Sequence, residues 1–379
     1  MNGSPRSNVV LVSGRGSIVR TVLVSGVTAL GLAFLPAVAA SGAAHQGGQT
    51  GETASAWRLT RVNTLPGDDV LDDVTVLGNG SVWAAGHGVV NGRRGGLVEW
   101  FDGRSWKVIP GSPPYELKAV TAGSDKDVWV FGPGKASRWN GRTWSTSSLG
   151  SGFSATDADG TGAKDVWAVA ESSARHWNGS SWQSVRLPAR AAAVDAYKAG
   201  DVWAAGTTGG RPAIMRWNGK SWALVPTPAI ELPASDAAAV LNDIAVLGPG
   251  NVWAVGGVSW EGADDEGDDV TYHRTLVMRW NGRSWTASVG TVNAQPYTEV
   301  EPDGKGGVWV AQGNWNPTLW RVTGSTWRST PIPRKAGTDA ALFSIARRPG
   351  TTTLWGAGFT VPQGDPDDPS ANGAFWRTN

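Results

Sequence analysis

The sequence predicts an all-β fold, a single seven-bladed propeller of four-stranded antiparallel blades, and three observations lead to this prediction. A tryptophan-rich phrase recurs with a period of roughly 40 residues, which is typical of propeller blades. Turn dipeptides such as Asn-Gly separate short runs of β-forming residues. The chain of 379 residues has 23 tryptophans and no cysteine, so packing must stabilise the fold without disulfides.

The first 40 residues are predicted to be a cleaved secretory signal peptide. They contain Arg6, Arg15 and Arg20, no acidic residue, an apolar stretch over 21–40 and the small-residue triplet 37–39. A retained membrane anchor is the rival interpretation, but the small residues before Ser41 favour cleavage. Residues 41–53 are small and polar and are expected to be a disordered linker, so the propeller is assigned to residues 54–379.

The charge balance limits the class of partner. Without the signal peptide the chain has 30 basic and 32 acidic residues, which is not the composition of a protein that binds nucleic acid or an anionic membrane. Arginine outnumbers lysine 24 to 9, as is common in GC-rich bacterial genomes. We therefore expect a secreted, extracellular bacterial protein, monomeric and without a resident cofactor, whose partners include a glycan, another cell-surface ligand or other secreted proteins.

Three tryptophan positions recur seven times each, and only Trp260 and Trp315 lie outside them. The first position follows Val or Leu, at Trp83, Trp129, Trp167, Trp203, Trp253, Trp309 and Trp355. The second precedes a turn, at Trp100, Trp139, Trp177, Trp217, Trp280, Trp320 and Trp376. The third follows that turn or, once, opens the domain, at Trp57, Trp106, Trp144, Trp182, Trp222, Trp285 and Trp327. Strand periodicity accounts for all 21, so we interpret them as core residues.

The shortest copy, residues 117–148, shows the expected blade. Strands are predicted over 117–123, 128–132, 136–139 and 142–148, with turns between them. Asn140-Gly141 predicts a two-residue type I′ turn, which would place Trp139 opposite Arg142 and diagonal to Trp144 on one face. The last copy ends at Asn379 without a fourth strand, whereas the domain begins with an orphan fourth strand around Trp57. Pairing these two ends would complete the seventh blade and close the ring.

Segments such as "DVWAVA" (165–170) and "RWNGRSW" (279–285) resemble the Trp-rich repeats of tectonin-type lectin propellers and, more loosely, Asp-box propellers. The resemblance covers nearly all of residues 54–379. It implies a propeller that binds sugars or bacterial surface components through variable loops, and it transfers no individual binding residue.

The loops between the second and third strands of each repeat vary most in length, and in a four-stranded meander they share one face. Trp260 and Trp315 fall in this region, as do Tyr272 and His87. We take these four as candidate ligand-binding residues, although local packing of the two tryptophans would explain them equally well.

Two groups of carboxylates are candidates for cation binding. The fifth-repeat loop concentrates five that could hold calcium or simply remain solvated, namely Asp264, Asp265, Glu266, Asp268 and Asp269. Acidic residues also flank the Val or Ile of the predicted inner strands, and Asp73, Asp243 and Glu299 would make the channel acidic if they face the axis. The alternative is that these residues accept hydrogen bonds from the backbone.

The motifs of serine hydrolases, zinc proteases and P-loop enzymes are absent from the sequence. The leading prediction is therefore a non-catalytic, lectin-like binding module that uses the face with the long second-to-third strand loops. The alternative is a polysaccharide hydrolase or lyase with carboxylates at the channel mouth, for instance Asp73 with Asp243 or Glu299, since glycoside hydrolysis requires a facing acid pair.

Overall fold

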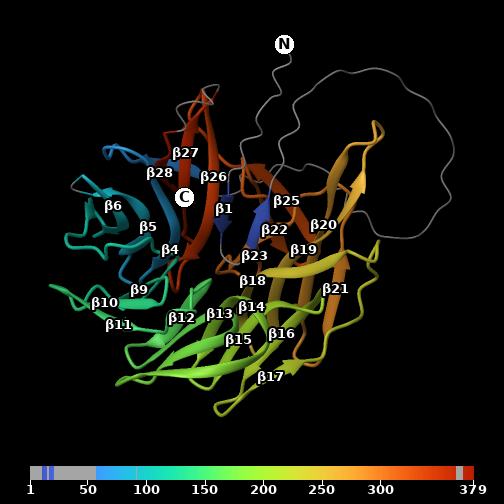
Figure 1. Cartoon of the computed structure of the whole chain (residues 1–379), viewed down its shortest axis with the longest axis horizontal. Helices are drawn as coiled ribbons and strands as arrows, with labels where there is room; N and C mark the ends of the chain where they lie inside the picture. The colour runs from blue at the N-terminus through green and yellow to red at the C-terminus, as the bar shows by residue number, and fades with distance from the viewer. Residues whose placement is uncertain (1–10, 15–16, 21–56, 91, 364–369) are drawn as a thin grey trace.

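The computed structural model describes residues 11–14, 17–20, 57–90, 92–363 and 370–379. From residue 57 onward the described strands form six sheets around a central axis (Figure 1). The innermost strand of each sheet contacts the innermost strand of the next, and β26 (Thr338–Arg347) contacts β4 (Asp69–Val76), so the ring is closed. The protein is therefore an all-β, tryptophan-rich propeller.

The predicted signal peptide and linker lie mostly outside the described residues. Within residues 1–40 the structure describes one antiparallel pair, β1 (Leu11–Gly14) and β2 (Ser17–Arg20). In the part of the chain that is described, no helix has the length and apolarity to cross a membrane.

Five sheets are four-stranded, and in four of them the chain runs up and down from the innermost strand outward, while the fifth receives its outermost strand from the start of the domain. One sheet contains β4, β5 (Val82–Val90), β6 (Arg93–Phe101) and β7 (Trp106–Val108). A second contains β8 (Ala119–Ser124), β9 (Asp127–Gly132), β10 (Lys135–Trp139) and β11 (Trp144–Ser148). A third contains β18 (Ala238–Gly248), β19 (Asn251–Ala263), β20 (Asp269–Trp280) and β21 (Trp285–Val289). The other two contain β22 (Tyr297–Pro302), β23 (Val308–Gln312), β24 (Thr318–Thr323) and β25 (Thr326–Pro331); and β26, β27 (Leu354–Pro362), β28 (Asn372–Arg377) and β3 (Arg58–Val62).

The prediction of seven blades is wrong, because the third and fourth repeats form a single six-stranded sheet. Its strands are β12 (Asp157–Gly162), β13 (Asp165–Trp177), β14 (Trp182–Lys198), β15 (Asp201–Thr208), β16 (Arg211–Trp217) and β17 (Trp222–Val225). The other links between repeats leave the sheets, but the link at 187–190 stays inside β14. Leu187 and Ala189 are buried there, so the strand that ends one repeat continues as the innermost strand of the next. Six blades result.

The last sheet is completed by the N-terminal strand of the domain, β3, which pairs with β28. Trp376 lies opposite Leu59, and Arg377 lies opposite Arg58. Trp57 is buried just before β3 and contacts Trp309 of the preceding sheet edge to face, at 5.7 Å between ring centroids. The two ends of the propeller are therefore joined through one sheet, which leaves no unpaired strand edge between its first and last repeats.

The seven tryptophans that follow Val or Leu are all buried. In five of the seven repeats an arginine on the next strand lies opposite this tryptophan and stacks on its indole; Arg138, for example, is 5.2 Å from the ring centroid of Trp129, and Arg216 is 4.7 Å from that of Trp203. Arg138 and Arg216 each also pair with the aspartate at the start of the tryptophan's own strand, for example Arg216 Nε with Asp201 Oδ1 at 2.7 Å. In these two repeats an Asp–Arg–Trp contact thus holds the two central strands together.

The hairpin after the second tryptophan differs from the predicted two-residue turn. Trp139 lies directly opposite Trp144, so the loop has four residues, and only Gly141 in it has a positive φ, at 92°. The Asn140 side chain explains the loop, since its Oδ1 accepts hydrogen bonds from the backbone N–H groups of Arg142 and Thr143, both at 2.9 Å. Asn178, Asn218 and Asn281 do the same in their repeats. An asparagine that caps its own loop replaces the type I′ turn.

Candidate functional site

The carboxylates next to the inner-strand Val or Ile form bridges between neighbouring strands. Asp73 Oδ2 on β4 accepts from the N–H of Val120 on β8 at 2.8 Å, while its Oδ1 accepts from Ser344 Oγ at 2.7 Å. Asp243 on β18 repeats this bond with the N–H of Val300 on β22, at 2.8 Å. Asp73, Asp243 and Glu299 are 0–2% exposed and do not belong to the described residues that line the central cavity. Their placement favours a structural role over an acid pair at the channel mouth.

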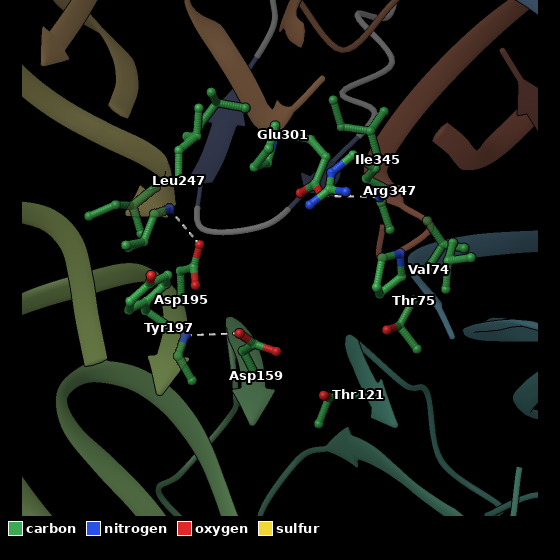
Figure 2. A pocket seen from close by; sticks show the side chains of 18 of the residues that line it. Val74, Thr75, Thr121, Asp159, Asp195, Tyr197, Leu247, Glu301, Ile345 and Arg347 are labelled. Atoms are coloured by element: carbon green, nitrogen blue, oxygen red, sulfur yellow. Dashed lines mark hydrogen bonds between the residues drawn. The ribbon is translucent and has the colours of Figure 1, made fainter. Parts of the chain in front are cut away.

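A cavity of about 720 Å³ occupies the channel toward the turns that follow the innermost strands. Residues from β4, β8, β12, β14, β18, β22 and β26 line it, so each of the seven repeats contributes a strand segment. Figure 2 shows Asp159, Asp195, Tyr197, Glu301 and Arg347 around the opening. The sequence predicted acidic residues beside the inner-strand Val or Ile, whereas the positions of Tyr197 and Arg347 at the opening became evident only with the fold.

The three cavity carboxylates are also bound to the backbone of the next strand. Asp159 Oδ2 accepts from the N–H of Ala196 at 2.9 Å, Asp195 Oδ2 from that of Val246 at 2.7 Å, and Glu301 Oε1 from that of Arg347 at 3.1 Å. Burial and the neighbouring carboxylate of Asp159 raise the pKa of Asp195 well above its ordinary value. The cavity is therefore polar and partly acidic, and its carboxylates accept backbone hydrogen bonds that join neighbouring inner strands.

The long-loop face carries the sequence-predicted aromatic pair. The hairpin of β19 and β20 extends beyond its neighbours (Figure 1), and on it Trp260 lies opposite Tyr272. Their rings stack at 5.5 Å between centroids with 19° between planes, and the Arg274 guanidinium lies 5.4 Å from the Trp260 ring. Trp260 is only partly exposed, because it also packs against the core cluster that contains Val258 and Leu276. The structure thus brings two predicted ligand residues together on one rigid hairpin.

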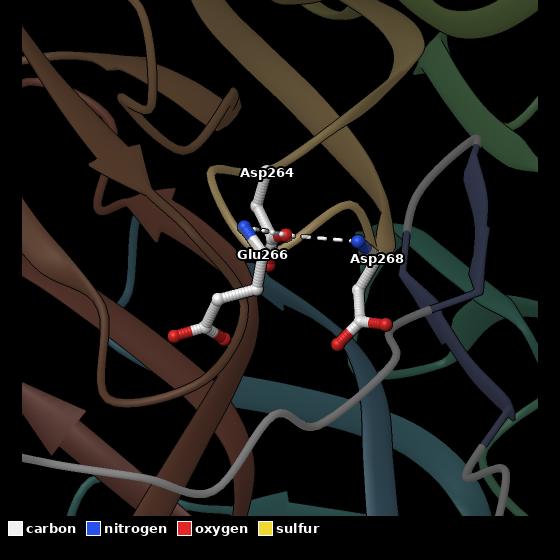
Figure 3. Close-up of side chains that lie close together, drawn as sticks. All are labelled: Asp264, Glu266 and Asp268. Carbon is white, nitrogen blue, oxygen red and sulfur yellow. Dashed lines mark hydrogen bonds between the residues drawn. The ribbon is translucent and has the colours of Figure 1, made fainter.

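The tip of the same hairpin is acidic. Asp264, Glu266 and Asp268 each offer one carboxylate oxygen, and these oxygens lie within 4.8 Å of one another (Figure 3). Asp264 Oδ1 also accepts hydrogen bonds from the N–H groups of Glu266 and Asp268, at 3.0 and 2.9 Å, which shapes the turn. These three residues could hold a hard cation such as calcium, whereas Asp265 and Asp269 are exposed residues of the same tip.

Trp315 is the only exposed tryptophan in the described part of the chain, with 47% of its surface accessible. It pairs as an isolated bridge with Ala341 near the start of β26, and its ring meets that of Phe359 at 6.1 Å and 61°. Phe359 is buried together with Phe343 in a small cluster at this end of the closing sheet. Trp315 therefore projects from an apolar base on the long-loop face.

A polar network lies beside Trp315 that sequence reasoning missed. Asp339 Oδ1 accepts from Asn316 Nδ2 at 3.0 Å, from Arg334 Nη1 at 2.8 Å and from Gln363 Nε2 at 2.7 Å. Partial burial raises the pKa of Asp339, but the bonds from Gln363, Asn316 and Arg334 outweigh it and lower the pKa overall. The four residues come from a loop, an inter-repeat link and two strand ends, so no spacing in the sequence could have grouped them.

His87 is held away from these aromatic residues, in a charged group of its own. Its Nδ1 lies 3.0 Å from Asp72 Oδ2, while Lys118 Nζ lies 2.9 Å from Asp72 Oδ1. Asp72 is 3% exposed, so both partners are anchored on a buried carboxylate. The predicted ligand residues thus occupy three places: the β19–β20 hairpin, the Trp315 surface and this group.

Comparisons with known proteins extend only to the fold. Neither a protein-family model nor a curated protein matches the chain. Among solved structures, "YCF48 bound to D1 peptide" is similar with a TM-score of 0.52 and 14% identity, covering 84% of this chain and 96% of that one. "Crystal Structure of Mitotic Checkpoint Complex" is similar with a TM-score of 0.54 and 13% identity, covering 87% of this chain and 97% of that one. These similarities show a shared propeller fold.

Proposed function

We propose that the protein is a secreted, non-catalytic recognition module that binds a glycan on the long-loop face, with Trp315 as its main contact. The observation that carries the proposal is the exposed indole of Trp315 set beside the Asp339 network. The 21 tryptophans of the repeat have a packing role, whereas an indole that is 47% exposed on a rigid base is available to a ligand.

The chemistry around Trp315 suits a sugar better than an apolar partner. A pyranose presents an apolar C–H face, which packs on a flat indole, and a rim of hydroxyls, which need donors and acceptors. Asn316, Arg334 and Gln363 supply amide and guanidinium groups, and Asp339 fixes their positions. The resemblance of the repeats to tectonin-type lectins supports the same ligand class.

The β19–β20 hairpin provides a second aromatic surface in this proposal. Trp260 and Tyr272 are stacked on a projecting hairpin, so their outer surfaces can contact a second residue of an extended glycan. Calcium at Asp264, Glu266 and Asp268 would relieve the repulsion between these carboxylates and order the tip. His87 borders the same face, where it would meet only a larger ligand.

Secretion belongs to the proposal, with residues 1–40 as a signal peptide that is removed and residues 41–53 as a tether. The test is the N-terminus of the exported protein: mass spectrometry should find a chain that begins at Ser41. An exported chain that retains residues 1–40 would instead support the membrane anchor.

A glycan array, combined with an activity screen on the same polymers, tests the ligand class. Wild type should bind at least one glycan without turnover, and Trp315→Ala should weaken that binding about tenfold or more, the effect of losing a central aromatic contact. Its free energy of unfolding should stay within about 0.5 kcal/mol of wild type, as for a surface substitution. Trp253→Ala is the matched control, because Trp253 is 5% exposed and its loss should cost about 3–5 kcal/mol of stability.

Each other outcome rejects a definite part of the proposal. Turnover of a polymer would replace it with the hydrolase or lyase alternative. Glycan binding that Trp315→Ala leaves intact would move the site away from Trp315. Binding to a protein or peptide but to no glycan would keep the recognition module and reject its ligand class.

A further inference from the structure

Directly opposed cations occur in the closing sheet. The sheet before it has one such pair, Arg321 opposite Arg328, but there Arg321 lies 3.4 Å from the Asp303 carboxylate. Arg377 on β28 lies opposite Arg58 on β3, and on its other side it lies opposite Trp355 on β27. Its guanidinium stacks on Trp355, 5.3 Å from the ring centroid, as the repeat arginines do elsewhere. Directly opposed like charges destabilise an antiparallel pair, so this arrangement is costly unless something compensates for it.

A third arginine adds to the same charge. Arg348 begins the turn that follows β26, with its backbone N–H bonded to Thr353 O at 2.8 Å, and its side-chain Nε donates to Gly78 O at 3.0 Å. Burial lowers the pKa of Arg377, and the charges of Arg58 and Arg348 lower it further. All three cations therefore act on one region, at the turn end of the closing sheet.

The last repeat lacks the aspartate that pairs with this arginine in the second and fourth repeats, a lack that it shares with the repeats that have Ser81, Asn251 or Gly307 at the same position. Arg138 pairs with Asp127 at 2.6 Å and Arg216 with Asp201 at 2.7 Å, in each case an aspartate two residues before the stacked tryptophan. In the last repeat Thr353 stands at that position. Among the described residues no carboxylate lies within 4.0 Å of the guanidinium nitrogens of Arg58, Arg348 or Arg377, and Arg377 Nε is buried without a hydrogen-bond partner.

We propose that Arg58, Arg348 and Arg377 form a binding site for an oxyanion, a phosphate or sulfate group. Guanidinium groups donate to such oxyanions in a planar, bidentate geometry, and one bound dianion would offset the mutual repulsion of the three cations. The ligand takes the place of the aspartate that Thr353 replaces. The group can be free or be an ester on a larger molecule, since both present the same oxygens.

The site is independent of the proposed glycan site. Trp315 pairs with Ala341 near the start of β26, whereas Arg348 follows the end of that strand, so the two sites lie at opposite ends of the closing sheet. A negative result for one of the two sites therefore does not contradict the other.

The experiment measures thermal stabilisation and calorimetric binding of sodium sulfate and sodium phosphate to the full chain, at an ionic strength held constant with NaCl. Wild type should bind, and Arg58→Ala should bind about threefold to fivefold more weakly, the effect of losing one exposed charge contact. Thr353→Asp should abolish anion binding while raising the melting temperature in anion-free buffer, because it restores the internal partner of Arg377. A folded variant that is more stable and no longer binds cannot be explained by misfolding.

Arg279→Ala is the matched control. Arg279 stacks on Trp253 in the same repeat position, 4.9 Å from the ring centroid, but lies opposite Thr286 rather than a second arginine, so its loss should not change anion binding. Dextran sulfate compared with uncharged dextran then distinguishes an ester on a polymer from a free anion. Equal anion affinity in wild type, Arg58→Ala and Thr353→Asp, or no anion binding at all, would overturn the proposal.

Discussion

Replacing Glu99 by glutamine should stabilise the protein at pH 8 and change its stability little at pH 4.5. Glu99 on β6 and Asp69 on β4 are both 0% exposed, and both accept a hydrogen bond from the same Asn63 Nδ2, each at 2.6 Å. Asn63 directly follows β3, so this contact ties the closing strand to the first sheet. Arg61 Nη2 lies 3.5 Å from Glu99 Oε2, as the nearest positive charge.

The magnitude follows from the environment of Glu99. The pKa of Glu99 is raised from 4.5 to about 7, mainly by burial, with Arg61 and Asn63 opposing the rise and the negative charge of Asp69 adding to it. A pKa that is higher in the folded state means that protonation favours folding. The contribution of Glu99 to stability is therefore complete below pH 4.5 and is lost as the pH rises through about 7. At about 1.4 kcal/mol for each pH unit in that window, ionised Glu99 costs roughly 3 kcal/mol at pH 8.

Urea denaturation of wild type and Glu99→Gln at pH 4.5 and pH 8 checks this reasoning. Glutamine keeps the acceptor for Asn63 and cannot ionise, so the variant should exceed wild type by about 2–3 kcal/mol at pH 8 only. Glu116→Gln is the control, because Glu116 is exposed and should show no such difference. A variant that is less stable than wild type at pH 8, or equally different at both pH values, would refute a protonated Glu99 in the closure.

Three further predictions concern the rest of the ring. The Asp125 carboxylate accepts hydrogen bonds from Asn79, Ser81 and the indoles of Trp83 and Trp100. Asp125→Ala should therefore lower the free energy of unfolding by about 2–4 kcal/mol in urea denaturation, whereas the control Glu231→Ala should leave it unchanged. Trp260→Ala should weaken glycan binding and cost less stability than Trp253→Ala; equal losses in the two variants would make Trp260 a core residue. Calcium at roughly 0.1–1 mM should protect the β19–β20 tip from proteolysis in wild type but not in Asp264→Asn, and equal protection in both would remove calcium from the proposal.

The four-stranded blade could be predicted from the sequence because each repeat carries its own local signals. The Val-Trp pairs predicted the buried second strand, and the segment around Trp139 and Trp144 predicted the outer hairpin. Both predictions were possible because strand periodicity and turn chemistry act over a few residues. The blade count failed at residues 187–190. Pro188 suggests a break there, but it lies between the paired positions Arg186 and Arg190, where a missing N–H is tolerated within β14.

The candidate sites depend on contacts between repeats, which spacing within a repeat does not reveal. The positions of Asp73 and Asp243 on the inner strands were evident, yet their carboxylates bond to Val120 and Val300 of the following repeats rather than face the mouth. Trp315 stood out because it breaks the repeat. Its polar neighbours did not, because an ordinary aspartate such as Asp339 becomes distinctive only when three donors converge on it.

Two contacts of the closing sheet link its structure to the proposed functions. This sheet is assembled from both ends of the domain, since β3 pairs with β28. Asn63 and two buried acids tie β3 to the first sheet, and Thr353 stands where the second and fourth repeats have the aspartate that pairs with the stacked arginine. Positions that break a locally consistent pattern without an internal gain are where function is expected. Glu99 has an internal explanation, since it closes the ring, whereas Arg58, Arg348 and Arg377 have no carboxylate partner within the described residues, which is why they are assigned to an anionic ligand.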